Sequence, residues 1–136
     1  MRIVLSGSVV TISGFSAILN RAFITGSVIT VPLRFKIGTG VTAPATTDTN
    51  LTTPLTTWYL GTAFKPYNST TTFDAANQKV TTQAFVSSTE ANGNVITEYG
   101  DFNSDAVSTC FSHTLFNSVT KTSGVQIYLT MTFRRA

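Results

Sequence analysis

The residues best suited to acid–base or metal chemistry are few. They are one histidine, His113, and the carboxylates Asp48, Asp74, Glu90, Glu98, Asp101 and Asp105. Glu98 and Asp101 stand three residues apart, with Asp105 close behind. Such a set can share a proton or hold a calcium ion. Asp101 and Asp105 also lie among Gly and Asn, which is typical of turns. We interpret the group as turn and edge carboxylates, and the sequence leaves cation binding open.

The sequence lacks the residues for a nucleophilic active site, a zinc site or a phosphate-binding loop. His113 has no second histidine beside it, and Cys110 is the only cysteine, so no zinc set forms. Cys110 lies in an apolar segment, which favours a small buried hydrophobe. The Gly38-Thr39-Gly40 pair is followed neither by a Lys-Ser/Thr nor by a helix, so it predicts a turn that glycine permits. We therefore expect no enzyme, no cofactor and no metal.

Composition narrows the class of protein. Of 136 residues, 42% are hydrophobic and only 11% are charged, less than half the usual share of about 25%. Disordered chains combine low hydrophobicity with high charge, so we reject disorder. The net charge is +3, and the basic residues are scattered except for Arg134-Arg135, which argues against nucleic-acid binding. The chain shows neither a signal-peptide pattern nor an apolar run long enough for a membrane span.

The elements that must position these residues are mostly strands. Alternating or β-branched segments at 2–12, 27–36, 56–60, 79–88, 95–99, 108–116 and 125–133 predict short strands, and the last alternates most strictly. Pro32 makes its strand an edge strand or a bulged one. Asn92-Gly93 predicts a hairpin turn before Val95. Residues 36–51 and 61–78 are expected to be loops. This pattern predicts one all-β domain over residues 1–136, an antiparallel sandwich or open barrel with long ordered loops.

One short helix is expected near the start of the chain. Five apolar residues with helical spacing predict its buried face: Phe15, Ile18, Leu19, Ala22 and Phe23. Ser13 is the expected N-cap, and Gly26 lies just beyond the end.

Three segments together resemble a family of small virion proteins of tailed bacteriophages. IGTGVTAPATTDTNL at residues 37–51 is similar to the family's "iGtGttaPaatDtaL". TEANGNVITEYGDFN at 89–103 resembles "eaNGniTEvGlFn", and VTKTSGVQIYLTMTF at 119–133 resembles "iTKTsd…l.v.w.ltF". The order and spacing also match, and the family has a short helix where residues 15–26 lie. The resemblance covers roughly residues 15–133.

The resemblance implies a non-enzymatic virion structural protein with no catalytic residues to carry over. Within that class we favour a capsid cement or decoration protein, as a homotrimer bound to major capsid protein in a virion assembled in the host cytoplasm. A tail, baseplate or fibre-attachment protein is the alternative. Two departures, Asp101 in place of an apolar residue and the absence of the Arg that often follows Leu51, suggest that the surface meeting the partner differs.

A receptor- or carbohydrate-binding β module is a further alternative, with Trp58, Tyr59, Phe64 and Tyr67 as an aromatic platform for sugars. In a β domain such aromatics more often anchor a core or an interface. The expected interface comprises Ile37, Thr39, Val41, Pro44, Asp48, Leu51, Trp58, Tyr59, Asp101 and Phe102. We expect residues 36–51 to form an ordered crossing loop, in which Asp48 closes a local turn and Leu51 attaches the far end to the core.

Overall fold

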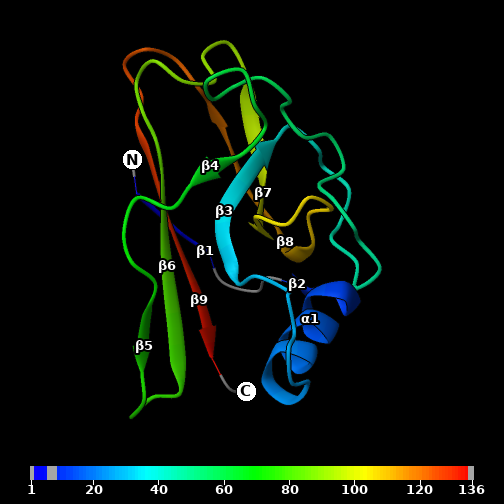
Figure 1. Cartoon of the computed structure of the whole chain (residues 1–136). Helices are drawn as coiled ribbons and strands as arrows, with labels where there is room; N and C mark the ends of the chain where they lie inside the picture. Colours follow the sequence, from blue (N-terminus) through cyan, green and yellow to red (C-terminus); the bar gives the residue numbers. More distant parts are fainter. Residues whose placement is uncertain (1, 6–8, 135–136) are drawn as a thin grey trace.

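The computed structural model describes residues 2–5 and 9–134, which form two β-sheets and one helix (Figure 1). The first sheet has the strand order β1 (Arg2–Leu5), β9 (Ile127–Arg134), β6 (Lys79–Val86) and β5 (Thr72–Asp74). The second has the order β2 (Val9–Val10), β8 (Cys110–Thr120), β7 (Val95–Asn103), β3 (Pro32–Gly38) and β4 (Lys65–Pro66). The predicted all-β sandwich is confirmed, and its sheets stay open.

The main core lies between the two sheets. Phe35, Ile37, Ile96 and Tyr99 enter it from the five-stranded sheet, and the first sheet supplies the buried residues of β6 and β9. A smaller cluster of Leu51, Phe102 and Cys110 lies apart from this core, with Phe64 packed against it. The chain therefore covers the five-stranded sheet on both faces, once with the other sheet and once with a loop.

The alternating strand at the end of the chain was predicted correctly. Ile127, Leu129 and Met131 are buried, while Tyr128 on the opposite face is 45% exposed. This strand pairs with β6 antiparallel and with β1 parallel, so it holds the centre of its sheet. The period-2 pattern identified it because only one of its faces meets the core.

The predicted Asn-Gly hairpin is wrong in its pairing. Residues 90–94 do turn, with Gly93 at φ +86° and Ala91 at φ +55°. The strands on either side belong to different sheets, because β6 pairs with β5 and β9 whereas β7 pairs with β3 and β8. The turn crosses between sheets, and the buried Lys121 secures it by donating from Nζ to Asn92 Oδ1 at 2.9 Å.

Other boundaries also differ from expectation. Residues 56–60 form no strand and contribute only an isolated bridge between Tyr59 and Thr62. The segment 61–78, expected to be loop, contains β4 and β5. Pro32 opens β3 and precedes a register shift at Pro32/Arg34, so the bulge alternative holds. Local propensity missed these elements because tertiary pairing decides such short strands.

The helix α1 (Ile12–Phe23) confirms the prediction of a short helix. The face that packs against the protein, however, is not the one that we expected. Thr11, not Ser13, is the N-cap, since its hydroxyl accepts a hydrogen bond from Gly14 N at 2.9 Å. The buried residues are the small Gly14 and Ala17, while the expected core face is exposed. A Cβ on Gly14 would lie 2.5 Å from Phe111 Cα, so the helix rests directly on the backbone of β8.

Candidate functional site

A long loop crosses from the end of β3 to β4 and forms the most distinctive surface of the chain (Figure 1). It returns beside the strand that it leaves, because Thr39 N donates to Thr53 O at 3.0 Å and Leu55 N donates to Ile37 O at 3.0 Å. We call residues 39–57 the crossing loop. The loop predicted over residues 36–51 is present but starts later than expected, because residues 36–38 belong to β3. Its base continues the pattern of the sheet.

The side chain of Glu98 holds the two ends of the crossing loop together. It lies fully buried on β7 and accepts hydrogen bonds from Gly40 N at 3.0 Å, Thr52 N at 3.0 Å and Thr53 N at 2.7 Å. The neighbouring Thr97 hydroxyl donates to Gly40 O at 2.7 Å. Each bond satisfies a backbone group that the loop would otherwise leave without a strand partner. Glu98 is thus a structural acceptor rather than the edge carboxylate that we expected.

Gly38 at the end of β3 and Gly40 in the crossing loop both lie close to the carboxylate of Glu98. The expectation that Gly38 and Gly40 permit a turn is wrong, because neither has a positive φ. A Cβ on Gly40 would instead meet Glu98 Oε1 at 2.7 Å, and one on Gly38 would meet the same oxygen. The Gly-x-Gly pattern therefore reflects a close approach of backbone to a buried carboxylate.

His113 joins this carboxylate to the middle of the crossing loop. Its ring is fully buried on β8, with Nε2 3.0 Å from Glu98 Oε2 and Nδ1 2.6 Å from Asp48 Oδ2. Gly100 stands opposite His113 in the β7–β8 register, and Glu98 lies two positions along on the same strand. Each ring nitrogen therefore lies within hydrogen-bond distance of a carboxylate oxygen. We call Asp48, Glu98 and His113 the loop clasp.

Asp48 closes a local turn, as the sequence predicted. Its Oδ2 accepts a hydrogen bond from Ala45 N at 2.8 Å, and its own amide donates to Ala45 O at 3.1 Å. Partial burial acts to raise the pKa of Asp48, but the hydrogen bonds from Ala45 and His113 outweigh it and hold the pKa below the ordinary value. Across residues 37–64 Asp48 is the only charged residue, and it is turned toward buried His113.

Asp101 is a second buried carboxylate with its own set of donors. Its oxygens accept from Tyr67 Oη at 2.5 Å, Tyr99 Oη at 2.6 Å and Ser112 Oγ at 2.5 Å. Burial raises the pKa of Asp101 above its ordinary value, against the lowering effect of these hydrogen bonds. Because this side chain is fully buried, Asp101 itself contributes to the interior and not to a partner surface.

The open question of a cation at Glu98, Asp101 and Asp105 has a structural answer. Asp105 accepts from Asn103 Nδ2 at 2.6 Å and from Thr30 N, so only this member behaves as a turn carboxylate. The three side chains bond to separate sets of donors. Within residues 2–5 and 9–134 no group of three or more His, Cys, Asp or Glu is arranged to hold a metal.

The expected interface residues divide by burial. Ile37, Leu51, Asp101 and Phe102 are at most 4% exposed, so their side chains belong to the interior and offer a partner no surface. Leu51 does fix the far end of the loop in the smaller core cluster, as predicted. Thr39, Pro44, Asp48, Trp58 and Tyr59 are partly exposed, and Val41 is 78% exposed.

The proposed aromatic platform does not form. Trp58 packs on Phe35 with ring centroids 5.6 Å apart and donates from Nε1 to Ala63 O at 2.8 Å. Phe64 instead lies against Phe102, at 5.7 Å, and Tyr67 bonds to Asp101. Trp58 and Tyr67 both pack on Phe35 in the main core, Tyr59 contacts Trp58, and Phe64 belongs to the smaller cluster, which agrees with their interpretation as anchors.

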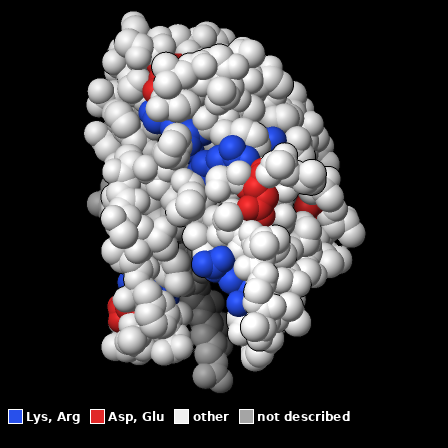
Figure 2. Space-filling view, viewed as in Figure 1, with Lys and Arg blue, Asp and Glu red and all other residues white. Residues whose placement is uncertain are grey.

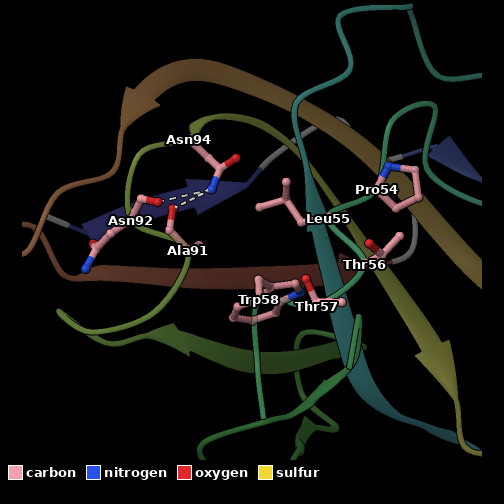
Figure 3. A pocket seen from close by; sticks show the side chains of 8 residues that line it. All are labelled: Pro54, Leu55, Thr56, Thr57, Trp58, Ala91, Asn92 and Asn94. Carbon is pink, nitrogen blue, oxygen red and sulfur yellow. Dashed lines mark hydrogen bonds between the residues drawn. The ribbon is translucent and has the colours of Figure 1, made fainter. Parts of the chain in front are cut away.

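A hollow of about 420 Å³ opens beside Trp58 (Figure 3). The loop residues 54–58 form one wall, and Ala91, Asn92 and Asn94 form the other. It contains no charged side chain, and its amides are already engaged: Asn94 Nδ2 donates to Ala91 O at 2.9 Å and Asn92 Nδ2 to Ser88 O at 2.9 Å. The hollow can accept a neutral group but presents no reactive one.

Cys110 is buried at 1% exposure, as the sequence predicted. Burial raises the pKa of its thiol to about 12, which makes it a poor nucleophile near neutral pH.

Sequence reasoning did not find the loop clasp, although its signals were present. A Gly-x-Gly at a strand end, an Asp ten residues on and one His in an apolar strand are separate hints, and the β7–β8 register joins them. In the part of the chain that the structure describes, no helix is long and apolar enough to cross a membrane. No family model, curated protein or solved structure matches the chain.

Proposed function

We propose that this chain is a non-enzymatic structural component of a bacteriophage virion. Within that class, we propose a capsid cement or decoration subunit that contacts major capsid protein and its own copies. The observation that carries the proposal is the crossing loop. It is rigidly held from inside by the loop clasp, and its outer surface, with Val41 78% exposed, carries no free charge. Such a surface is suited to being covered by a neighbour, because little polar solvation is lost.

The buried carboxylates explain how so weakly charged a chain keeps its loops ordered. Glu98, Asp101 and Glu90 all accept internal hydrogen bonds, and Glu90 also pairs with Lys65 at 2.6 Å. Figure 2 shows that uncharged residues make up most of the visible face, with only small groups of charged atoms. The chain thus uses its acids for internal order and leaves its surface for contacts between proteins.

The three segments of the virion-protein resemblance meet in the structure. Gly40 and Asp48 of the first segment bind Glu98 and His113, and Glu98 belongs to the second. The third supplies Lys121, whose backbone oxygen accepts from Gly93 N at 2.9 Å and whose Nζ binds Asn92. These residues of the three segments therefore position the crossing loop and the turn at 90–94. This supports a resemblance in the residues that hold the fold together. The surface residues would determine which partner the protein binds.

The test is incorporation of the chain into particles. We expect mass spectrometry of particles purified on a density gradient to detect the chain, and immunogold labelling to place it on the head. Recombinant Val41→Arg should lose binding to particles that lack the native chain. The matched control Val107→Arg, at an 88% exposed position of the β7–β8 connection, should retain it. Absence of the chain from purified particles would overturn the proposal, and tail labelling would favour the baseplate or fibre-attachment alternative.

The hollow beside Trp58 favours a second candidate, a carbohydrate-binding module. Neutral sugars suit an uncharged concave site with amide and hydroxyl groups at its rim. Under this alternative, isothermal titration with oligosaccharides shows saturable binding. Thr57→Trp fills the hollow and abolishes that binding, whereas Thr70→Trp at an exposed position elsewhere leaves it intact. Absence of binding across a glycan array removes this candidate.

A further inference from the structure

The helix α1 turns its large apolar side chains away from the protein. Ile12 is 60% exposed, Phe15 57%, Leu19 42% and Phe23 79%. These positions follow one another at spacings of three and four residues, so they form one stripe along the helix. The buried Gly14 and Ala17 lie on the opposite side, against β8. We call Ile12, Phe15, Leu19 and Phe23 the α1 stripe.

The exposed apolar surface around the α1 stripe approaches the size of an interface. Taking about 200 Å² for a large side chain, the four stripe residues expose roughly 480 Å². Ile18 at 49% and Ile24 at 56% exposed, next to the stripe, bring the apolar patch to roughly 700 Å². The largest apolar patch on a typical monomer is about 300–600 Å², and a standard interface buries about 800 Å² per partner. A patch of this size is therefore costly in water and close to what one side of a specific complex needs.

A hollow at the edge of the α1 stripe forms a pocket that could hold an aromatic side chain. It has a volume of about 230 Å³ and lies between the helix and residues 30–32, with Ala17, Ala22, Val31 and Phe111 in its wall. Interfaces concentrate binding energy where an aromatic side chain enters such an apolar pocket. The protruding Phe23 and this hollow belong to the same surface region, so two copies present each other with both parts.

Charge decides which partner the stripe fits. The helix carries a single charged residue, Arg21, and its Nη1 is already engaged with Ile29 O of its own chain at 2.7 Å. Helices that bind membranes have a polar face rich in Lys and Arg, which is missing here. Each copy has a net charge of +3, so two copies approach best through a region without free charge. The stripe meets that condition.

We infer that the α1 stripe is a self-association surface whose occupant is the same surface of a second copy of this chain. Phe23 is the central anchor, and the hollow beside Ala17 and Ala22 receives an aromatic ring. The contact is apolar and forms without any other virion component. It is measured on the isolated chain, so its failure leaves the virion assignment untouched.

Sedimentation equilibrium of the full chain tests this surface. We expect the native chain to be dimeric, because a contact between identical surfaces closes with two copies. Phe23→Glu should weaken association at least about 30-fold, as for an interface anchor. The matched control is Phe73→Glu on β5, an exposed Phe at 64% in the other sheet, which should associate like the native chain. Circular dichroism should show both variants folded, because neither residue is buried.

A cross-linking experiment gives a second measure that does not depend on weakening the interface. Leu19→Cys should form a disulfide-linked dimer on mild oxidation, while Phe73→Cys should not. The native Cys110 stays silent because it is buried at 1% exposure. A native chain that is monomeric throughout the concentration range overturns the inference. So does equal dissociation by Phe73→Glu, and so does a monomer that co-floats with neutral lipid vesicles, which assigns the stripe to a membrane.

Discussion

At the scale of single residues, ionisable groups act here as connectors between backbone segments. Glu98 bonds three loop amides and one imidazole, and Asp101 bonds three hydroxyls. A buried carboxylate is costly unless its oxygens are satisfied, and both sets meet that requirement. The sequence offered these residues as candidates for chemistry, and their donors identify them as parts of the framework.

Glu98→Gln should loosen the crossing loop. The amide keeps the shape of the side chain but turns a donor toward groups that already donate, so we expect a loss of about 2–3 kcal/mol in the free energy of unfolding. Hydrogen exchange should quicken at Gly40, Thr52 and Thr53. The control Asp74→Asn, at the partly exposed end of β5, should change hydrogen exchange at these three amides little. Unchanged exchange at the three loop amides would contradict the assigned role.

Asp48→Asn should remove a pH-dependent part of the stability. The pKa of Asp48 lies below its ordinary value of 3.8 in the folded chain, so folding favours the ionised form. Its contribution is full above that ordinary value and is lost as the pH falls through the folded pKa. The native chain should therefore exceed the variant in stability at neutral pH, and the gap should narrow as the pH falls below the ordinary pKa of 3.8 and through the folded pKa. Urea unfolding at each pH measures the gap, and a constant gap refutes the mechanism.

At the scale of elements, the strands follow from local pattern and the loops from distant contacts. The alternation of Ile127, Leu129 and Met131 identified β9 because burial on one face repeats every two residues. The crossing loop was recognised as ordered, but its anchors come from β7 and β8, 45 to 65 residues later in the chain. No local pattern reveals a hydrogen bond at that separation.

The helix shows the opposite failure of local reasoning. Its apolar spacing was detected correctly, yet an amphipathic pattern does not say which face meets the chain's own core. Gly14 decides the matter, because only a residue without Cβ lets the helix approach Phe111 so closely. A small-residue face packed inward leaves the large apolar residues for a partner.

Gly40→Ala should test the fit between the crossing loop and Glu98. The new methyl group would press on the carboxylate at 2.7 Å, where the neighbours have little room to move. We expect a loss of about 1–3 kcal/mol, the usual effect of overpacking. Gly124→Ala is the matched control, since its nearest neighbour would be 3.8 Å away and the effect should be small. Thermal unfolding of both variants measures the difference, and equal melting temperatures would count against the close approach.

At the scale of the whole molecule, low charge and exposed apolar surface belong together. A monomer with 11% charged residues and a stripe of large apolar side chains is poorly suited to remain alone in solution. The proposed self-association would account for both features, because contact surfaces lose less when few ions must be desolvated. The composition therefore predicted a surface with few charges. The structure shows that large exposed apolar side chains gather on α1.

Self-association through the α1 stripe should resist salt. Attraction between charges weakens as the Debye length falls from about 10 Å at 0.1 M to about 3 Å at 1 M, whereas apolar contact does not depend on it. Sedimentation equilibrium across that range should give a dissociation constant that stays constant or decreases. A marked weakening at high salt would point to ion pairs and away from the stripe.

The pairing of β1 with β9 has a consequence for synthesis of the chain. β1 is the first strand and β9 the last, and they lie side by side in parallel (Figure 1). Contacts between such distant segments form late and slow folding, because a long loop must close before they form. During translation β1 waits without its partner until residues 127–134 leave the ribosome. Refolding should accordingly show docking of the first strand as its last event, and a nascent chain that stalls before Ile127 should stay open to proteases.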